Sequence, residues 1–164
     1  MSLFPAAALA VGLLVAQSGN PQSGLGPKFN SLSPQDSARL DKQRLLVAAA
    51  VKQHYGGILT RSQKDLPLLQ KLIDDSVFNK TQTYELQSIG IVFGDVLVSA
   101  LPLHWVMITD ESGTDPTLRY KNTSANINAM TMISKRVEQG RRVNLQELLV
   151  NTREGLVEFE KNSR

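Results

Sequence analysis

Apolar residues recur with a helical period in three segments between residues 33 and 100. Ser33 and Pro34 form a cap and a first-turn proline, and the glycine pair at 56–57 is a stop signal, so the first helix is predicted between them. A second helix is predicted from Leu66 to Val77 and a third from Leu86 to Ala100. The three apolar stripes are, in order, Leu40, Val47, Val51 and Tyr55; Leu66, Leu69, Ile73 and Val77; and Leu86, Ile89, Gly90, Phe93, Val96, Leu97 and Ala100.

The third of these helices is expected to be the central core helix, because its apolar residues fall on one face. Gly90 and Gly94 lie one turn apart on it, and each costs about 1 kcal/mol relative to alanine in a helix. This pairing favours a close backbone approach by another element, with a gap for a ligand as the alternative.

After Pro102 the apolar period changes from helical to alternating. Alternation over His104–Thr109 and again over Thr117–Lys121, with a polar loop at 110–116 between them, predicts an antiparallel hairpin. Helical spacing returns from Ile127 to Val137, and a last helix is predicted after the cap residue Asn144. The sequence thus predicts an α+β fold over residues 34–161, with about five helices packed on a short antiparallel sheet that contains a central β-hairpin.

The N-terminal end differs in composition from the rest of the chain. Residues 1–18 are mostly apolar, carry no Lys or Arg, and end in Ala16-Gln17-Ser18, a small-x-small pattern. This is typical of a signal-peptide-like leader, and the run is shorter than the roughly 20 residues of a stable membrane span. A core-packing or disordered apolar end is the alternative. Residues 19–33 are rich in Gly, Pro, Ser and Asn, which predicts a flexible linker and, with the leader, a periplasmic or secreted domain.

The amino-acid composition excludes several classes of chemistry. The 164 residues contain no cysteine, which excludes disulfides, thiolate nucleophiles, cysteine-held zinc and an acylated lipoprotein cysteine. The length fits one domain. The net charge is only +3, with acidic and basic residues interspersed, so sequence-specific nucleic-acid binding is not expected. No cofactor or metal motif is present, and we expect none to be bound.

Catalytic chemistry has few candidates, because the chain contains only two histidines. His54 suits the C-terminal end of the first helix as a dipole-complementing cap. His104 begins a predicted strand, and a hydrolase-like enzyme using His104 with Asp110 or Glu111 is one functional alternative. The acidic loop with Gly113 and Asp115 lacks the D-x-D-x-D-G series of a calcium loop and is interpreted as a solvated turn.

The leading hypothesis is a non-enzymatic binding or protein-interaction module, because an enzyme usually displays more positioned titratable groups. Trp105 and Tyr120, expected to face each other across the hairpin, would supply apolar contacts, although core packing is the alternative. The basic residues that flank Gly140 would contact an envelope protein or an anionic ligand, although they also suit a helix C-terminus. These four residues are Lys135, Arg136, Arg141 and Arg142. A third hypothesis is an immunity or inhibitor protein that neutralises a toxin.

Three stretches of the sequence are also similar to a known protein family. They are Gln87-Ser88-Ile89-Gly90-Ile91-Val92-Phe93-Gly94-Asp95; then His104-Trp105-Val106 with Asp110, Gly113 and Leu118-Arg119-Tyr120; and finally Ile133-Ser134-Lys135-Arg136-Val137-Glu138-Gln139-Gly140. Together they resemble a bacterial family known only as a domain of unknown function, over about Tyr84 to Leu149. The resemblance implies a fold and a bacterial, often exported, origin, and it implies no catalytic residues.

Overall fold

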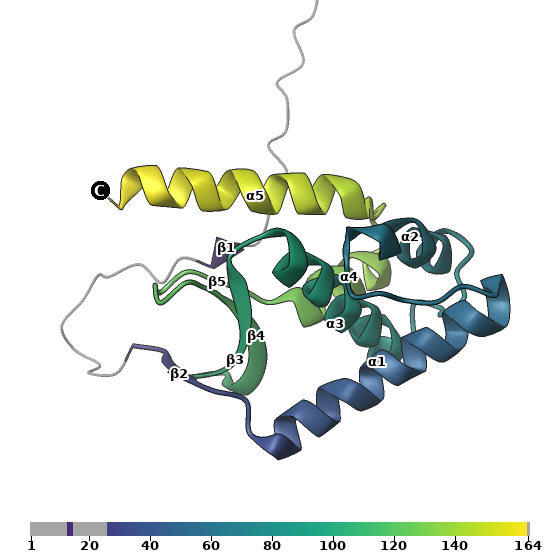
Figure 1. Cartoon of the computed structure of the whole chain (residues 1–164), viewed down its shortest axis with the longest axis horizontal. Coiled ribbons are helices and arrows are strands. Elements are labelled where there is room, and N and C mark those ends of the chain that lie inside the picture. Colours follow the sequence, from purple (N-terminus) through teal and green to yellow (C-terminus); the bar gives the residue numbers. More distant parts are fainter. Residues whose placement is uncertain (1–12, 15–25, 164) are drawn as a thin grey trace, which may run out of the picture.

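The structure, a computed structural model, describes residues 13–14 and 26–163. Its elements, in chain order, are β1 (Leu13–Leu14), β2 (Lys28–Asn30), α1 (Pro34–Tyr55), the 3-10 turn η1 (Gln63–Asp65), α2 (Leu66–Asp74), α3 (Thr83–Ala100), β3 (Leu103–Asp110), β4 (Gly113–Tyr120), β5 (Asn126–Ile127), α4 (Ala129–Glu138) and α5 (Leu145–Asn162). The α+β prediction is confirmed. In Figure 1 the long helices α1 and α5 lie on the outside, with α3 and α4 between them and the sheet at one end.

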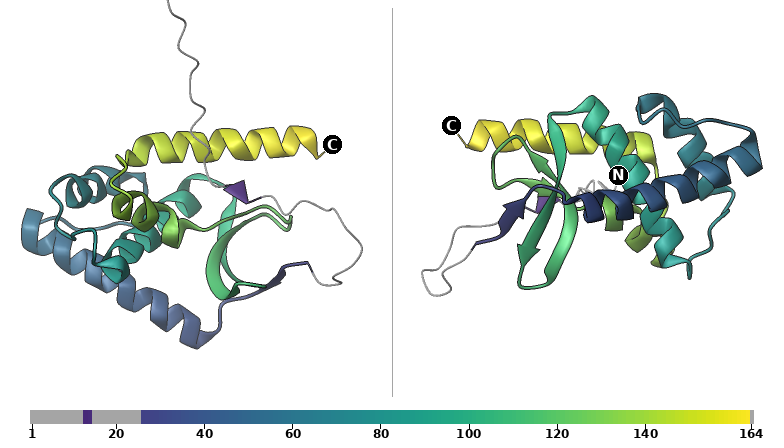
Figure 2. Two further views of the ribbon diagram at one scale, coloured as in Figure 1. Left: turned by 180° about the vertical axis from the view of Figure 1, so that it is seen from behind. Right: turned by 60° about the horizontal axis from the view of Figure 1, so that its bottom comes forward.

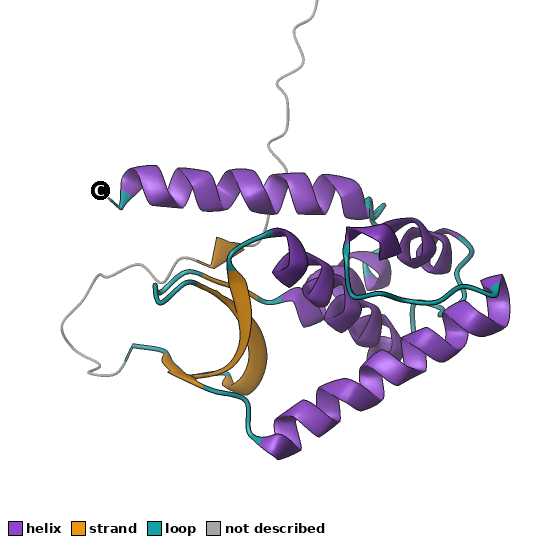
Figure 3. Ribbon diagram, viewed as in Figure 1, coloured by secondary structure: helices purple, strands orange, loops and turns teal. Residues whose placement is uncertain are grey.

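The sheet is antiparallel throughout, in the order β1-β5-β4-β3-β2. Its centre is the predicted hairpin of β3 and β4, visible as the two long strands in Figure 3. The hairpin is longer than predicted, because Asp110 already pairs with Gly113 and the expected loop at 110–116 is mostly strand. Pro116 is tolerated in β4 because β5 pairs only with Leu118 and Arg119, so no second neighbour needs an N–H from Pro116.

Helix α1 begins and ends where its sequence signals predict. The Ser33 side chain accepts a hydrogen bond from the Asp36 backbone N–H at 3.1 Å, and the Asp36 carboxylate accepts one from the Ser33 backbone, which completes a capping box. Gly56 ends the helix in the left-handed conformation, with φ of 64°. His54 lies in the last turn, as predicted, and its side chain is exposed.

Two helix boundaries differ from the prediction. Helix α2 ends at Asp74 rather than Val77, because Ser76 turns the chain with φ of 51°. The predicted helix from Ile127 begins only at Ala129, because Asn126 and Ile127 form β5 and pair with β4. The apolar residue Ile127 fits both a helical period and a short buried strand. The local sequence pattern therefore does not distinguish the two structures.

Helix α3 is the core helix that the sequence predicts. Every residue from Ser88 to Leu97 is buried, and the two views of Figure 2 show α3 enclosed by the other helices and the sheet. A Cβ atom on Gly90 would lie 2.4 Å from the Met130 carbonyl oxygen, and one on Gly94 would lie 2.4 Å from the Trp105 ring. The predicted close backbone approach is therefore confirmed at Gly90, whereas at Gly94 the close neighbour is the Trp105 side chain.

The predicted linker at 19–33 needs a correction. Lys28–Asn30, inside that range, form β2 and pair with Met107–Thr109 of β3. The Arg119 guanidinium lies over the Phe29 ring, 4.4 Å from its centroid. Phe29, the aromatic residue of this polar stretch, thus gives β2 a packing contact with β4. The folded domain therefore begins before residue 34.

The predicted leader at 1–18 lies outside the described residues except for Leu13 and Leu14. These two form β1 and pair with Asn126 and Ile127 of β5. None of the helices that the structure describes is long and apolar enough to span a bilayer.

Candidate functional site

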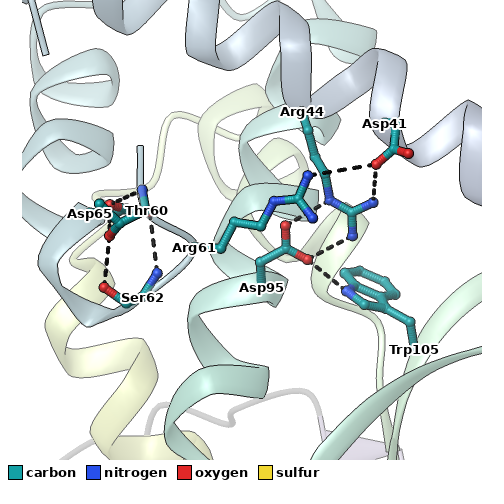
Figure 4. A network of polar contacts seen from close by, with 8 residues as sticks. All are labelled: Asp41, Arg44, Thr60, Arg61, Ser62, Asp65, Asp95 and Trp105. Carbon is teal, nitrogen blue, oxygen red and sulfur yellow. Dashed lines mark hydrogen bonds and ion pairs between the residues drawn. The ribbon is translucent and has the colours of Figure 1, made fainter. Parts of the chain in front are cut away.

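A largely buried ion pair links helix α1 to the core helix α3. The Arg44 guanidinium on α1 donates two hydrogen bonds to the Asp95 carboxylate on α3, Nε to Oδ2 and Nη2 to Oδ1, each 2.7 Å long. Trp105 on β3 donates its indole N–H to Asp95 Oδ1 at 2.9 Å. One carboxylate on α3 thus holds a side chain from α1 and one from the sheet (Figure 4).

The geometry makes this pair strong. Its two side chains are 14% and 8% exposed, so little solvent screens them, and the bidentate arrangement is the preferred contact of guanidinium with carboxylate. The hydrogen bonds to Asp95 raise the pKa of Arg44, against the opposing effect of burial. The Asp41 carboxylate accepts a further bond from Arg44 Nη1 at 3.0 Å, which leaves Arg44 fixed on both sides.

Arg61 reaches the same site from a tightly built turn. The buried Asp65 carboxylate accepts hydrogen bonds from the backbone N–H and hydroxyl of Thr60, the shortest 2.8 Å, and from the Ser62 N–H. Between Thr60 and Ser62, Arg61 adopts a left-handed backbone with φ of 54°, an unfavourable conformation for a residue with a side chain. The Asp65 bonds hold the turn, and Arg61 Nη2 lies 3.8 Å from Asp41 Oδ1.

These residues line a groove of about 390 Å³ between α1, α3 and the Leu59–Arg61 segment. We call this cavity the α1–α3 groove. Its walls are apolar and its charged groups are the two arginines and two aspartates already described. The lining residues are Asp41, Arg44, Leu45, Ala48, Leu59, Arg61, Val92 and Asp95. Leu45, one of the lining residues, is 69% exposed, so a large apolar side chain stands in solvent at this face.

The predicted aromatic pair is not brought together. In the β3–β4 register Trp105 lies opposite Leu118, and Tyr120 lies opposite Leu103, two pairs further along. Tyr120 is only 4% exposed, and its hydroxyl bonds to Glu160 on α5. Burial, and then the Glu160 contact, raise the pKa of Tyr120. Trp105 packs on Gly94 and bonds to Asp95, so both rings connect elements of the fold.

The predicted basic cluster is only partly available to a ligand. Arg136 turns back and donates to the Met132 carbonyl oxygen of its own helix at 2.6 Å. Its pKa is lowered by burial and by the neighbouring charge of Arg141. Lys135, Arg141 and Arg142 are exposed at the end of α4 and the following turn. Gly140 turns the chain there with φ of 66°.

The predicted hydrolase arrangement is not assembled. His104 is exposed near the start of β3, opposite Arg119, whereas Asp110 ends the same strand. Six residue steps along the strand separate them by about 20 Å, and Glu111 lies in the turn beyond. In the described part of the chain no cluster of three metal-ligating side chains occurs.

The sequence patterns assign no site role to Asp95, Arg44 or Arg61, although Asp95 ends the first stretch that carries the resemblance. Asp95 carries a recognisable signal, since it is the one charge in the apolar run from Ser88 to Leu97, and a charge in such a run requires a partner. That partner lies 51 residues away in the chain, and no local pattern points to Arg44. The left-handed turn at Arg61 depends on the Asp65 contacts and has no glycine to mark it.

Comparisons with known proteins place the chain by family and by fold. A crystal structure from Bacteroides thetaiotaomicron aligns with 83% of this chain at a TM-score of 0.71 and 18% identity. The alignment covers 50% of that protein's chain, so this chain spans about half its length, and the likeness shows the fold alone. None of the curated proteins matches this chain.

The family described as a domain of unknown function (DUF3806) matches residues 65–148, just over half of the 164-residue chain. That range includes Asp95 and Trp105, and it overlaps the Tyr84–Leu149 stretch that carries the resemblance in the sequence. The resemblance is therefore confirmed, and the chain belongs to the DUF3806 family.

Proposed function

We propose that this protein is a non-enzymatic binding domain of the bacterial cell envelope, and that its α1–α3 groove holds an apolar side chain of a partner protein next to a carboxylate. The observation that carries the proposal is a groove whose Arg44 and Asp95 are already paired with each other, beside an apolar side chain, Leu45, that stands in solvent. Leu45 is 69% exposed, and exposed apolar surface with a polar rim is typical of interaction sites.

Arg61 is the group that would pair with the partner's carboxylate. Its side chain is 62% exposed, and its only ion-pair contact among the described residues is the long one of 3.8 Å to Asp41. Arg44, by contrast, has its donors engaged by Asp95 and Asp41. Arginine is enriched at protein interfaces because its planar guanidinium can bind a carboxylate with two hydrogen bonds. The Asp65 turn holds Arg61 in place, which lowers the entropy that binding costs.

The test is an NMR titration of the labelled full chain with N-acetyl-leucine, which joins an apolar side chain to a carboxylate. We expect resonances of Leu45, Leu59 and Arg61 to shift, and N-acetyl-leucinamide, which lacks the charge, to shift them less. Arg61→Gln should weaken binding of N-acetyl-leucine about tenfold, the effect of roughly 1.4 kcal/mol. Arg153→Gln, on the exposed side of α5, is the matched control and should leave binding unchanged. Equal binding by Arg61→Gln and the wild type would reject the groove.

We also propose that the chain is exported to the periplasm or beyond, on the basis of the apolar leader. Cleavage after Ser18 would remove β1 and leave β5 at the edge of the sheet, since Leu13 and Leu14 pair with β5. Expression of the full chain in a bacterial host, followed by fractionation and intact-mass measurement, should recover a periplasmic product about eighteen residues short. A cytosolic product that keeps Met1 would contradict export.

A further inference from the structure

Helix α5 carries two exposed valines on the side that faces away from the domain. Val150 is 36% and Val157 is 46% exposed, and because they lie seven residues apart they project from the same side of the helix. The buried residues Leu148, Thr152 and Leu156 lie on the opposite side. Figure 1 shows α5 along the outside of the molecule, with the other helices and the sheet on one side of it.

Packing within the chain does not explain these valines. Valine is a weaker helix former than alanine because of its β-branched side chain, and at an exposed position little burial offsets this cost. The described residues expose five large apolar side chains, and two of them lie on this one side of α5. The other three lie on α1, on the loop after it and on α3, and they are Leu45, Ile58 and Tyr84. Exposed apolar residues at a seven-residue spacing are typical of a helix that packs against a second helix.

The charges between the two valines indicate which helix that is. Arg153 and Glu154 are exposed there, and neither forms an ion pair with another described residue. A second copy of α5 that crosses this side antiparallel, with a two-fold axis between residues 153 and 154, brings Arg153 of each copy opposite Glu154 of the other. The same axis brings Val150 of each copy opposite Val157 of the other, because a two-fold axis makes every contact twice. A parallel pair would instead place arginine opposite arginine.

The position of this axis also fits the length of the helix. Residues 153 and 154 are the middle of α5, which runs from Leu145 to Asn162, so the two antiparallel helices overlap along all of their length, about 27 Å. Near the ends, the exposed Lys161 of one copy lies opposite Gln146 of the other and one residue from Glu147. Opposite charges therefore meet both at the centre and near the ends of the helix pair.

We infer that this side of α5 is a self-association surface, where a second copy of the chain binds through its own α5 in the antiparallel direction. We call it the α5 face. The valines supply the apolar contact and lose their exposure to solvent on association. The ion pairs set the direction and register of the two helices more than the affinity, because exposed ion pairs contribute little energy. The residues of the α5 face are Gln146, Val150, Arg153, Glu154, Val157 and Lys161.

Sedimentation equilibrium of the purified full chain tests the α5 face directly. We expect the mean mass to rise with concentration from the mass of one chain towards that of two. Val150→Glu and Val157→Glu should each weaken association at least about tenfold, because each places a carboxylate opposite a valine of the other copy. A wild-type chain that remains a monomer at millimolar concentration would overturn the inference, and so would a dimer that both variants leave unchanged.

A charge exchange tests the antiparallel direction. Arg153→Glu should weaken association about tenfold, because it places two glutamates opposite each other twice in the dimer. The double variant Arg153→Glu with Glu154→Arg should associate like the wild type, because the exchanged charges again lie opposite each other. Lys42→Glu, at an exposed position of α1, is the control and should change nothing. A double variant as weak as Arg153→Glu would reject the antiparallel pairing of α5.

The α5 face and the α1–α3 groove give distinguishable results, because they share no residue. Leu45→Glu should weaken the binding of N-acetyl-leucine at the groove and leave self-association unchanged. Val157→Glu should do the reverse. Arg153→Gln likewise should change only self-association, so it remains a control for the groove.

Discussion

Replacement of Asp95 by alanine is expected to lower the free energy of unfolding by about 3–5 kcal/mol, the usual effect of removing one partner from a buried ion pair. The variant leaves the Arg44 guanidinium, with a side chain only 14% exposed, without the carboxylate that accepts two of its hydrogen bonds. It also leaves the Trp105 indole N–H without its acceptor. Urea unfolding followed by fluorescence measures the effect, because Trp105 is the only tryptophan.

The control for this prediction is the other carboxylate bound to the same arginine. Asp41 is 55% exposed, and exposed ion pairs contribute about 0–1 kcal/mol, so Asp41→Ala should be nearly neutral. The double variant Arg44→Met with Asp95→Leu should recover most of the stability lost in Asp95→Ala, because an apolar pair needs no charge compensation. A loss below about 1 kcal/mol in Asp95→Ala would contradict the role of this pair as the link between α1 and α3.

The second large effect is expected at Gly90. Alanine there would place its Cβ 2.4 Å from the Met130 carbonyl oxygen and 2.5 Å from that of Ala129. Both obstacles are backbone atoms of α4, so no rotamer change can relieve them and the two helices must separate. We expect Gly90→Ala to lower the free energy of unfolding by about 3 kcal/mol, the upper part of the range for overpacked cores, despite the better helix propensity of alanine.

Gly26→Ala provides the matched control, because a Cβ there has nothing within 4 Å. In thermal and urea unfolding, Gly90→Ala should be less stable than the wild type, and Gly26→Ala should be about as stable as the wild type. Gly94→Ala should behave differently from both, since its Cβ would meet the Trp105 ring, and the fluorescence of the folded state should therefore change. A Gly90→Ala protein as stable as the wild type would show that α3 and α4 can separate at little cost.

Strong local signals explain where the sequence prediction succeeded. The Ser33 cap, Pro34 and Gly56 act through contacts within one turn of the chain. Such contacts do not depend on the rest of the fold, so α1 has the predicted bounds. The apolar run of α3 likewise predicts a central helix, because only a helix surrounded by other elements can bury so many residues. The hairpin follows from alternation over β3 and β4.

The errors lie where pairing partners, rather than local pattern, decide the structure. Lys28–Asn30 become a strand because β3 offers an open edge and Arg119 packs on Phe29. Ile127 belongs to β5 rather than to a helix because Leu118 lies opposite it. The predicted aromatic pair does not form because the strand register places Tyr120 two pairs away from Trp105, and α5 contacts Tyr120 through Glu160.

The sequence by itself determined the fold class, the cap-to-stop bounds of α1, the core position of α3 and the family resemblance, because each depends on contacts close in the chain or on apolar period. Only the tertiary structure decided the candidate sites. Arg44 meets Asp95 across 51 residues, and Arg61 owes its position to the Asp65 turn. Such side chains meet only after packing has set helix orientation and strand register, which short-range sequence patterns do not encode.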